Sequence, residues 1–156
     1  RIRPLLRSPK LGPLLWQLPP SLPYDLDRLA AVLEHLHDGQ RHAFEFRHPA
    51  WFREEVYTLL REHRVALVIG DRPEVHAFQA HELTADFVYV RFHAGTRGRN
   101  GNYSHAELDE WAERLERWSR EAEVFAYFNN DWEGYAVENA RYLRARLGRP
   151  AYAATG

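Results

Sequence analysis

The chain has 156 residues, a net charge of −1 and no cysteine. This length predicts one domain with a substantial core, and the balanced charge excludes a general attraction to nucleic acid or acidic membranes. The lack of cysteine excludes disulfides, thiolate metal sites and cysteine nucleophiles, and it is typical of a reducing compartment. No apolar run approaches the ~20 residues of a membrane span. We therefore expect a cytoplasmic protein without a membrane partner.

The first half of the chain alternates short apolar runs with amphipathic segments. Leu11–Leu18 is an apolar run followed by two prolines, and it predicts a buried strand. Asp25 is a suitable cap for the following helix, which we expect Gly39 to close. His42–Arg47 predicts the second strand, and the next amphipathic segment predicts a helix that ends near His63.

The same alternation continues through the second half. Val65–Ile69 and Phe87–Phe92 predict two strands separated by an irregular polar segment. Ser104 and Glu107 have the spacing of a capping box at the start of another helix. Val124–Phe128 predicts the fifth strand, and a final helix follows it. Five βα units with nearly continuous apolar strands are typical of a parallel sheet covered by helices.

Two architectures fit this pattern, a doubly wound open sheet and part of a (β/α)₈ barrel. In both, ligands bind at the carboxyl ends of the strands. Each predicted strand has an apolar body and polar side chains at its end. We expect these side chains to meet at one edge of the sheet, where they would form a functional site: Gln17, Glu45, Arg47, His48, Asp71, Arg91, His93, Asn129, Asn130 and Asp131.

Several of these residues lie in segments that resemble a known family. The segments are LGPLLWQLPPS (Leu11–Ser21), EFRHPAW (Glu45–Trp51), Asp71 after VALVIG, TADFVYVRFHAG (Thr84–Gly95), and YFNND (Tyr127–Asp131) with Gly134, Ala136 and Asn139. In order and spacing they are similar to the YecE-like family, also called domain of unknown function 72. The resemblance implies a TIM-barrel fold and no settled biochemical activity.

The resemblance also implies that the chain is the C-terminal portion of such a barrel. Its five βα units correspond to strands four to eight of a TIM (β/α)₈ barrel. We therefore expect an α/β fold in which residues 1–150 form part of a single barrel domain and residues 151–156 form a disordered tail. Five parallel strands cannot close a barrel, so both sheet edges would be open to pairing.

Glu45 and Arg47 share one face of their strand, because side chains alternate along a strand. Two interpretations stay open at this point. The pair is a buried ion pair that fills the barrel interior, or Arg47 anchors an anion while Glu45 is a general base or a metal ligand. His48 lies on the opposite face, where it binds substrate or bonds to a backbone carbonyl of the following loop.

Arg91 and His93 share a face at the end of the strand that aligns with the seventh barrel strand, and a glycine-rich loop follows from Gly95 to Tyr103. Barrels often bind phosphate with the loops after strands seven and eight. Glycines let backbone N–H groups approach an anion, and Arg97 and Arg99 would add charge. The alternative is a solvated, mobile loop.

A divalent metal could be held by four side chains at strand ends, namely Glu45, Asp71, His93 and Asp131. No local spacing motif supports such a site, so the sequence leaves both metal and cofactor unknown. Asn129, Asn130 and Asp131 bind substrate hydroxyls or base edges, or they cap the last helix. Trp111 is predicted to be a core residue, because its helical spacing places it on an apolar face.

These observations support the hypothesis of an enzyme acting on a phosphate ester, in a nucleic acid or a sugar phosphate. Glu45, Asp71 and His93 are the catalytic candidates. The substrate-binding candidates are Gln17, Arg47, His48, Arg91, Tyr103, Asn129, Asn130 and Asp131. The alternative is a non-catalytic protein that binds a metabolite or a nucleic acid at the same edge. The sequence does not determine the oligomeric state.

Overall fold

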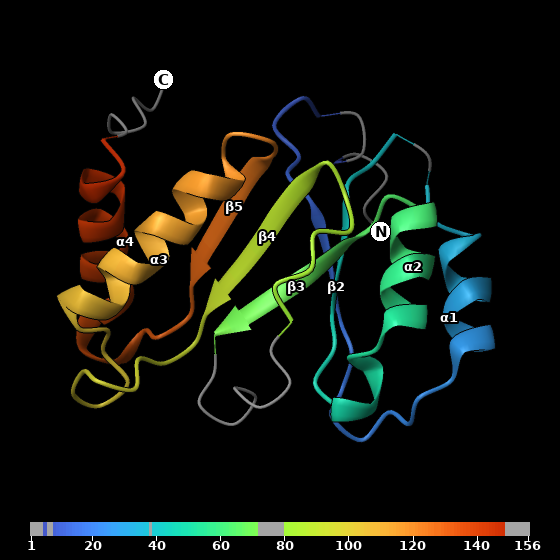
Figure 1. Cartoon of the computed structure of the whole chain (residues 1–156), viewed down its shortest axis with the longest axis horizontal. Coiled ribbons are helices and arrows are strands. Elements are labelled where there is room, and N and C mark those ends of the chain that lie inside the picture. The colour runs from blue at the N-terminus through green and yellow to red at the C-terminus, as the bar shows by residue number, and fades with distance from the viewer. Residues whose placement is uncertain (1–4, 6–7, 38, 72–79, 149–156) are drawn as a thin grey trace. The chain divides into compact units, whose positions relative to one another are not determined.

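The structure is a computed structural model, and it describes residues 5, 8–37, 39–71 and 80–148. Strands and helices alternate along this part of the chain (Figure 1). Their bounds are β1 Leu14–Gln17, α1 Leu26–Leu33, β2 His42–Glu45, α2 Glu54–Glu62, β3 Ala66–Asp71, β4 Phe87–Phe92, α3 His105–Trp118, β5 Glu123–Phe128 and α4 Tyr135–Arg146, with short 3₁₀ helices at Pro49–Trp51 and Trp132–Gly134. The α/β fold class predicted from the sequence is confirmed.

The chain divides into two compact units, which are described separately here. The first consists of Arg1–Ile69 and Ala80–Tyr89, and the second of Gly70–Gln79 and Val90–Gly156. The first unit contains β1, β2 and the beginnings of β3 and β4, in that order across the sheet. The second contains the ends of β3 and β4, followed by β5. Each unit therefore has its own set of strand ends.

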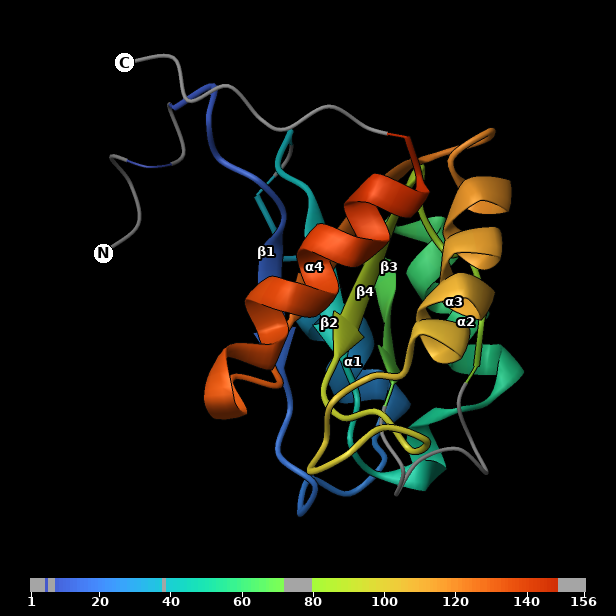
Figure 2. The same ribbon diagram turned by 90° about the vertical axis from the view of Figure 1, so that its left-hand side faces the viewer.

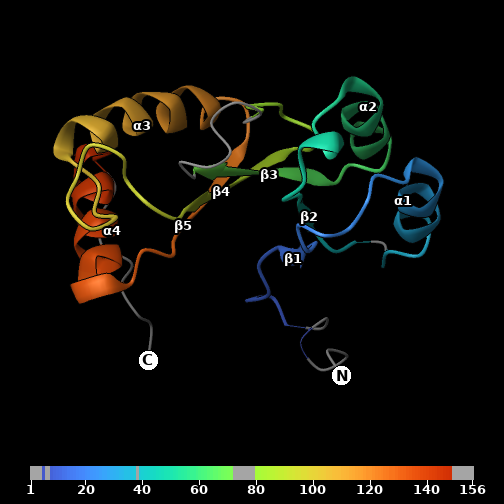
Figure 3. The ribbon, with the colours of Figure 1, turned by 90° about the horizontal axis from the view of Figure 1, so that it is seen from below.

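The register of the first unit brings two polar residues level with each other. β1 and β2 are parallel, with Leu14 opposite His42 and Gln17 opposite Glu45. β2 and β3 are also parallel, with Phe44 opposite Leu67. Helices α1 and α2 lie next to each other on one side of β2 (Figure 3). The polar residues that end β1 and β2 thus lie side by side.

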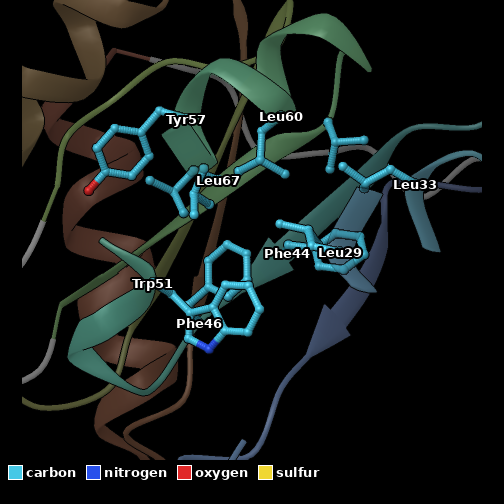
Figure 4. Close-up of a cluster of buried hydrophobic side chains, with 10 residues drawn as sticks. Leu29, Leu33, Phe44, Phe46, Trp51, Tyr57, Leu60 and Leu67 are labelled. Carbon is cyan, nitrogen blue, oxygen red and sulfur yellow. The ribbon is translucent and has the colours of Figure 1, made fainter. Parts of the chain in front are cut away.

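The core of the first unit lies between β2 and the two helices. Phe44 and Phe46 point into it together with Leu29 of α1 and Leu60 of α2 (Figure 4). The rings of Phe46 and Trp51 are stacked, with centroids 4.9 Å apart. Because side chains alternate along a strand, the residues between and after these phenylalanines face the other side of the sheet.

The core of the second unit lies beneath its two helices. α3 and α4 lie side by side (Figure 2). The rings of Phe92, at the end of β4, and Phe128, at the end of β5, are stacked with centroids 4.4 Å apart. Trp111 of α3 packs edge-on against Phe92, with centroids 5.0 Å apart. Aromatic packing therefore continues to the ends of these strands.

Helix α1 begins as predicted but ends earlier. The Asp25 side chain accepts a backbone N–H of the first turn, as expected of an N-cap. The helix ends at Leu33, so the prediction that Gly39 closes it was wrong. Tight turns to Val32 and Leu33 carbonyls follow directly and end the helix. Gly39, with φ of +78°, lies in the next turn of the chain.

The outer strands are more exposed than a continuous apolar pattern suggests. Side chains of β2, β3 and β4 are almost all buried, whereas most of those in β1 and β5 are not. Trp16 is 40% exposed and Tyr127 is 41% exposed. Each of these strands has a single neighbouring strand in the order given above.

The predicted tail at 151–156 lies outside the described residues. No helix within the described ranges is long and apolar enough to cross a membrane.

Thr84 connects the polar segment before β4 to β3. Its hydroxyl accepts the Leu67 N–H and donates to the Val65 carbonyl, both at 2.7 Å. The side chain is 3% exposed, so water cannot replace these bonds. A segment that the sequence describes only as irregular thus contains a buried anchor for a strand.

We expect Thr84→Val to lower the free energy of unfolding by about 2 kcal/mol, because valine has the same shape but leaves a buried N–H and a buried carbonyl unpaired. Denaturant unfolding measures this change. Thr84→Ser, which keeps the hydroxyl, should restore most of the loss. Equal stability of the valine and serine variants would contradict the proposed role of the hydroxyl.

Candidate functional site

The strand ends of the first unit contain a row of three polar side chains. Arg47 Nε donates to Glu45 Oε1 at 3.2 Å, and Arg47 Nη2 donates to Gln17 Oε1 at 2.7 Å. The row exists because Gln17 and Glu45 are opposite each other in register, and Arg47 follows two residues later on the same face. The Glu45 side chain is 3% exposed and that of Arg47 is 27% exposed.

This geometry is compatible with both interpretations of the Glu45–Arg47 pair. Glu45 and Arg47 form an ion pair, as one interpretation requires, with the carboxylate buried and the guanidinium partly exposed. A guanidinium has five N–H groups, and the bonds to Glu45 and Gln17 use two of them. Since Arg47 is partly exposed and fixed on two sides, it can present its other N–H groups to an anion without losing the ion pair.

His48 has a structural role in this conformation. Its Nδ1 accepts the Ala50 N–H at 3.1 Å, so it caps the 3₁₀ helix Pro49–Trp51. The prediction of a bond to a backbone carbonyl of the following loop was wrong, because the partner is a backbone N–H. This nitrogen is already engaged and is not oriented toward Arg47, which lies on the opposite face of the strand.

Trp16 contacts a buried histidine beside this row. Its indole N–H donates to His42 Nδ1 at 3.0 Å, and His42 Nε2 lies 3.3 Å from the His37 carbonyl. Burial lowers the pKa of His42. The neutral tautomer with its hydrogen on Nε2 satisfies both contacts. His42 therefore holds Trp16 in place as a neutral group.

In the second unit, the carboxylate of Glu107 organises the glycine-rich loop. Its Oε1 accepts the N–H groups of Thr96 at 2.6 Å and Arg97 at 2.9 Å, and the Thr96 hydroxyl at 3.0 Å. Its Oε2 accepts the N–H and the hydroxyl of Ser104, both at 2.8 Å. The capping box predicted for Ser104 and Glu107 is confirmed. One carboxylate thus holds the loop against the start of α3.

These bonds determine the charge state of Glu107. Burial by itself would raise its pKa, but hydrogen bonds from the backbones of Ser104, Arg97 and Thr96 and from the Ser104 hydroxyl lower the pKa from 4.5 to about 2. The group is therefore ionised in the folded protein over the whole neutral range. It occupies the position that an external anion would need in order to bind the same N–H groups.

The close packing of the loop explains two of its glycines. A Cβ atom at Gly95 or Gly98 would collide with the backbone carbonyl of Asn102. The two glycines thus allow the two sides of the loop to approach each other. The expectation that glycines let backbone N–H groups approach an anion holds for the internal anion, Glu107.

Asn130 and Asn139 anchor the other side of the loop. Asn130 Nδ2 donates to Asn139 Oδ1 at 2.8 Å and to the Gly101 carbonyl at 3.3 Å. The Tyr103 N–H donates to the same Asn139 oxygen at 3.4 Å. Asn130 is only 6% exposed. Its predicted contact with substrate stays a prediction, but its amide already fixes the loop.

Asp71 ends β3 in a buried aromatic setting. Its Oδ2 accepts the indole N–H of Trp111 at 2.9 Å, and the residue is 6% exposed. Tyr103, 2% exposed, also faces this carboxylate. Burial raises the pKa of Tyr103, and the nearby charge of Asp71 raises it further. The Tyr103 hydroxyl has no partner with good hydrogen-bond geometry among the described residues.

The remaining candidates of the second unit lie around the ends of β4 and β5. Arg91 Nε donates to Asn129 Oδ1 at 3.0 Å, so the structure brings these two together. The backbone N–H of His93 donates to the Asp71 carbonyl at 3.1 Å, which places His93 next to Asp71 in the sheet. Asp131 is exposed at the start of a 3₁₀ helix, and its side chain forms no capping bond there.

The four side chains considered for a metal do not form a cluster within the part of the chain that the structure describes. There, no group of three or more histidine, aspartate or glutamate side chains is arranged to hold a metal ion. Asp71 contacts Trp111 and faces Tyr103, and Glu45 pairs with Arg47. In the structure, these two carboxylates therefore contact protein side chains.

Three residues with central roles were missing from the sequence-based candidates. Glu107 was identified only as a helix cap, although a buried glutamate after a glycine-rich loop can also bind the loop's N–H groups. Trp111 was assigned to the core, which is correct, but its indole N–H also fixes Asp71. Asn139 has a sequence signal, because asparagine on the buried face of a helix requires hydrogen-bond partners.

The fold and these side chains define an α/β protein with polar groups at the carboxyl ends of its strands. The family described as "Protein of unknown function DUF72" matches residues 1–155, and the chain belongs to this family. The match confirms the resemblance found in the sequence. A comparison with curated proteins found no match.

Solved structures of the same family are similar to this chain. A DUF72 family protein from Thermotoga maritima is 30% identical, with a TM-score of 0.83 over 95% of this chain and 62% of that chain. A DUF72 family protein from Enterococcus faecalis, in two crystal structures, is 23% and 24% identical, also with a TM-score of 0.83, over 96% of this chain. At this identity the second protein supports the fold alone. The chain spans 62% to 66% of the length of these structures.

We expect Glu107→Gln to lower the free energy of unfolding by about 3.5 kcal/mol at pH 7. Glu107 has a lower pKa in the folded state than in the unfolded state, so its contribution is present above pH 4.5 and is lost as the pH falls toward 2. A fall from 4.5 to about 2, at ~1.4 kcal/mol per pH unit, gives this magnitude.

Urea unfolding of wild type and Glu107→Gln between pH 7 and pH 2.5 checks this prediction, and the difference between them should shrink with acid. Glu110→Gln is the matched control. Glu110 is an exposed partner of Arg97 on the same helix, so its loss should change stability by less than ~1 kcal/mol. A difference that is independent of pH would show that Glu107 acts through packing alone.

We expect Trp111→Phe to destabilise the protein by about 2 kcal/mol, because it removes a hydrogen bond from a buried carboxylate while keeping an aromatic ring next to Phe92. Thermal and denaturant unfolding measure the loss. Unchanged stability would mean that Asp71 does not depend on the indole N–H.

Proposed function

We propose that the protein is an enzyme that acts on a phosphate ester, in a nucleic acid or a sugar phosphate, at the carboxyl ends of its strands. The observation that supports this most directly is the fixed position of Arg47. Its guanidinium is held by Glu45 and Gln17 while the side chain stays 27% exposed. An arginine fixed in this way binds a phosphate oxygen with little loss of side-chain freedom.

In this proposal, each unit has one arginine at its strand ends that is a candidate for binding phosphate. Arg47 acts in the first unit and Arg91, bonded to the Asn129 amide, in the second. Asp71 and His93 are the candidates for proton transfer. Glu45 is the third, although its carboxylate already accepts a bond from Arg47. Gln17, His48, Tyr103, Asn129, Asn130 and Asp131 remain candidates for substrate contacts.

The glycine-rich loop has a different role from the one suggested by its composition. Its N–H groups at Thr96 and Arg97 bind Glu107, so they support the loop rather than a phosphate. We propose that the loop borders the strand ends of the second unit and contributes the side chain of Arg99, which is exposed.

We also propose that the five βα units belong to a TIM (β/α)₈ barrel, as its strands four to eight, with residues 1–150 in one domain. The order of the strands along the sheet follows the sequence, as a barrel requires. The solved structures of the family, which are longer, are consistent with further strands. The number of strands in the whole protein decides this proposal.

The alternative function is a non-catalytic protein that binds a metabolite or nucleic acid with the same strand ends. One observation favours it. Glu45 is 3% exposed and bonded to Arg47, and Asp71 is 6% exposed and bonded to Trp111, so two of the three catalytic candidates are engaged within the protein. Turnover of a phosphate ester that binds would decide in favour of the enzyme.

We expect Arg47→Ala to weaken the binding of phosphate esters at least about tenfold, because a hydrogen bond to a charged group is worth roughly 1.5–3 kcal/mol. Calorimetric titration with a panel of phosphate esters measures this effect. Arg53→Ala is the control, since Arg53 contacts Tyr24 and Glu55, which are not part of this row. If both variants bind as well as wild type, Arg47 does not hold the phosphate.

A further inference from the structure

The cationic group of the first unit is already neutralised within the protein. Glu45 lies 3.2 Å from the Arg47 guanidinium and is 3% exposed, so solvent screens the pair only weakly. Gln17 adds a neutral amide on the other side of the guanidinium. The row therefore offers directed N–H donors with almost no net charge.

The second unit shows the same pattern around its loop. The Thr96, Arg97 and Ser104 N–H groups, which could surround an anion, bind the Glu107 carboxylate. The guanidinium of Arg97 bonds to Glu110 at 2.9 Å. Arg91 donates to the neutral amide of Asn129. Internal carboxylates thus balance most of the groups that a strongly charged ligand would need.

Phosphate esters differ in the charge that a site must balance. A monoester carries a charge of roughly −1.5 to −2 at neutral pH, because its second pKa is about 6. A diester carries a single negative charge and has no second proton to lose. A fixed carboxylate next to the arginine repels the second charge of a monoester and leaves the donor geometry for a diester intact.

We infer that the ligand of this site is a phosphate diester rather than a phosphate monoester, and that Glu45 sets this preference by neutralising Arg47. The inference rests on the function proposed above and narrows its substrate class. It gives Glu45 a role in specificity that does not require a free carboxylate. The preference comes from repulsion of the wrong ligand, which is a common route to specificity.

Titration of the full chain with diethyl phosphate and with ethyl phosphate at pH 8, followed by NMR, tests this inference. The two probes share their phosphate and ethyl groups but differ in charge. Wild type should bind the diester more tightly. In Glu45→Gln, the ratio of the two affinities should shift toward the monoester by about tenfold, because the repelling charge is gone and an oxygen acceptor for Arg47 Nε is retained.

Glu55→Gln is the matched control. Glu55 is an exposed residue of α2 that accepts a bond from Tyr24, outside the row, so its removal should leave the ratio unchanged. Thermal unfolding establishes that each variant is folded. If Glu45→Gln does not fold, the wild-type preference between the two probes decides by itself.

Tighter binding of ethyl phosphate by wild type, or an unchanged ratio in folded Glu45→Gln, would overturn the inference while the proposed phosphate site stands. Binding of neither probe would overturn both. A dinucleotide and glycerophosphoglycerol, each compared with its monoester, then identify the source of the diester. The inference predicts that at least one of these diesters binds more tightly than its monoester, and the reverse order for both would contradict it.

Discussion

The arrangement of the second unit depends on a single buried charge. Glu107 lies at the first turn of α3, where the N–H groups of a helix are unpaired, and it accepts bonds from that turn and from the loop before it. A side chain without an acceptor oxygen there would leave the loop N–H groups of Thr96 and Arg97 without this partner. The loop, the start of α3 and the amide contacts of Asn139 form one connected assembly, which brings Tyr103 to Asp71.

In the first unit, strand register provides the hydrogen-bond partners of a nearly buried carboxylate. Parallel pairing sets Gln17 level with Glu45, and the alternation of the strand brings Arg47 to the same face. In both units a carboxylate that is nearly buried is balanced by donors from the protein itself. The charges of Glu45 and Glu107 are therefore balanced by groups close to them within the protein.

Much of the fold could be predicted from the sequence, because it depends on local patterns. Phe87–Phe92 is a strand with the predicted bounds, and Ser104 with Glu107 forms the predicted cap. The pairing of Arg47 with Glu45 follows from strand alternation. The contacts of Trp111 and Asn139 could not be predicted, because they join residues 40 and 36 positions apart whose proximity depends on helix packing. The predicted end of α1 was wrong because the prediction relied on a glycine. The helix instead ends in tight turns that have no sequence signature.

The loop from Gly95 to Tyr103 has a consequence for which substitutions the fold tolerates. Its backbone is fixed by Glu107, by the two asparagines and by glycines that admit no Cβ atom. The side chain of Arg99, in contrast, is exposed, and that of Arg97 pairs with Glu110 at the surface. Substitutions at such positions change what the surface presents without disturbing the support beneath it. A change at Arg99 should therefore cost the fold little, whereas a side chain larger than hydrogen at Gly95 or Gly98 would force the two sides of the loop apart.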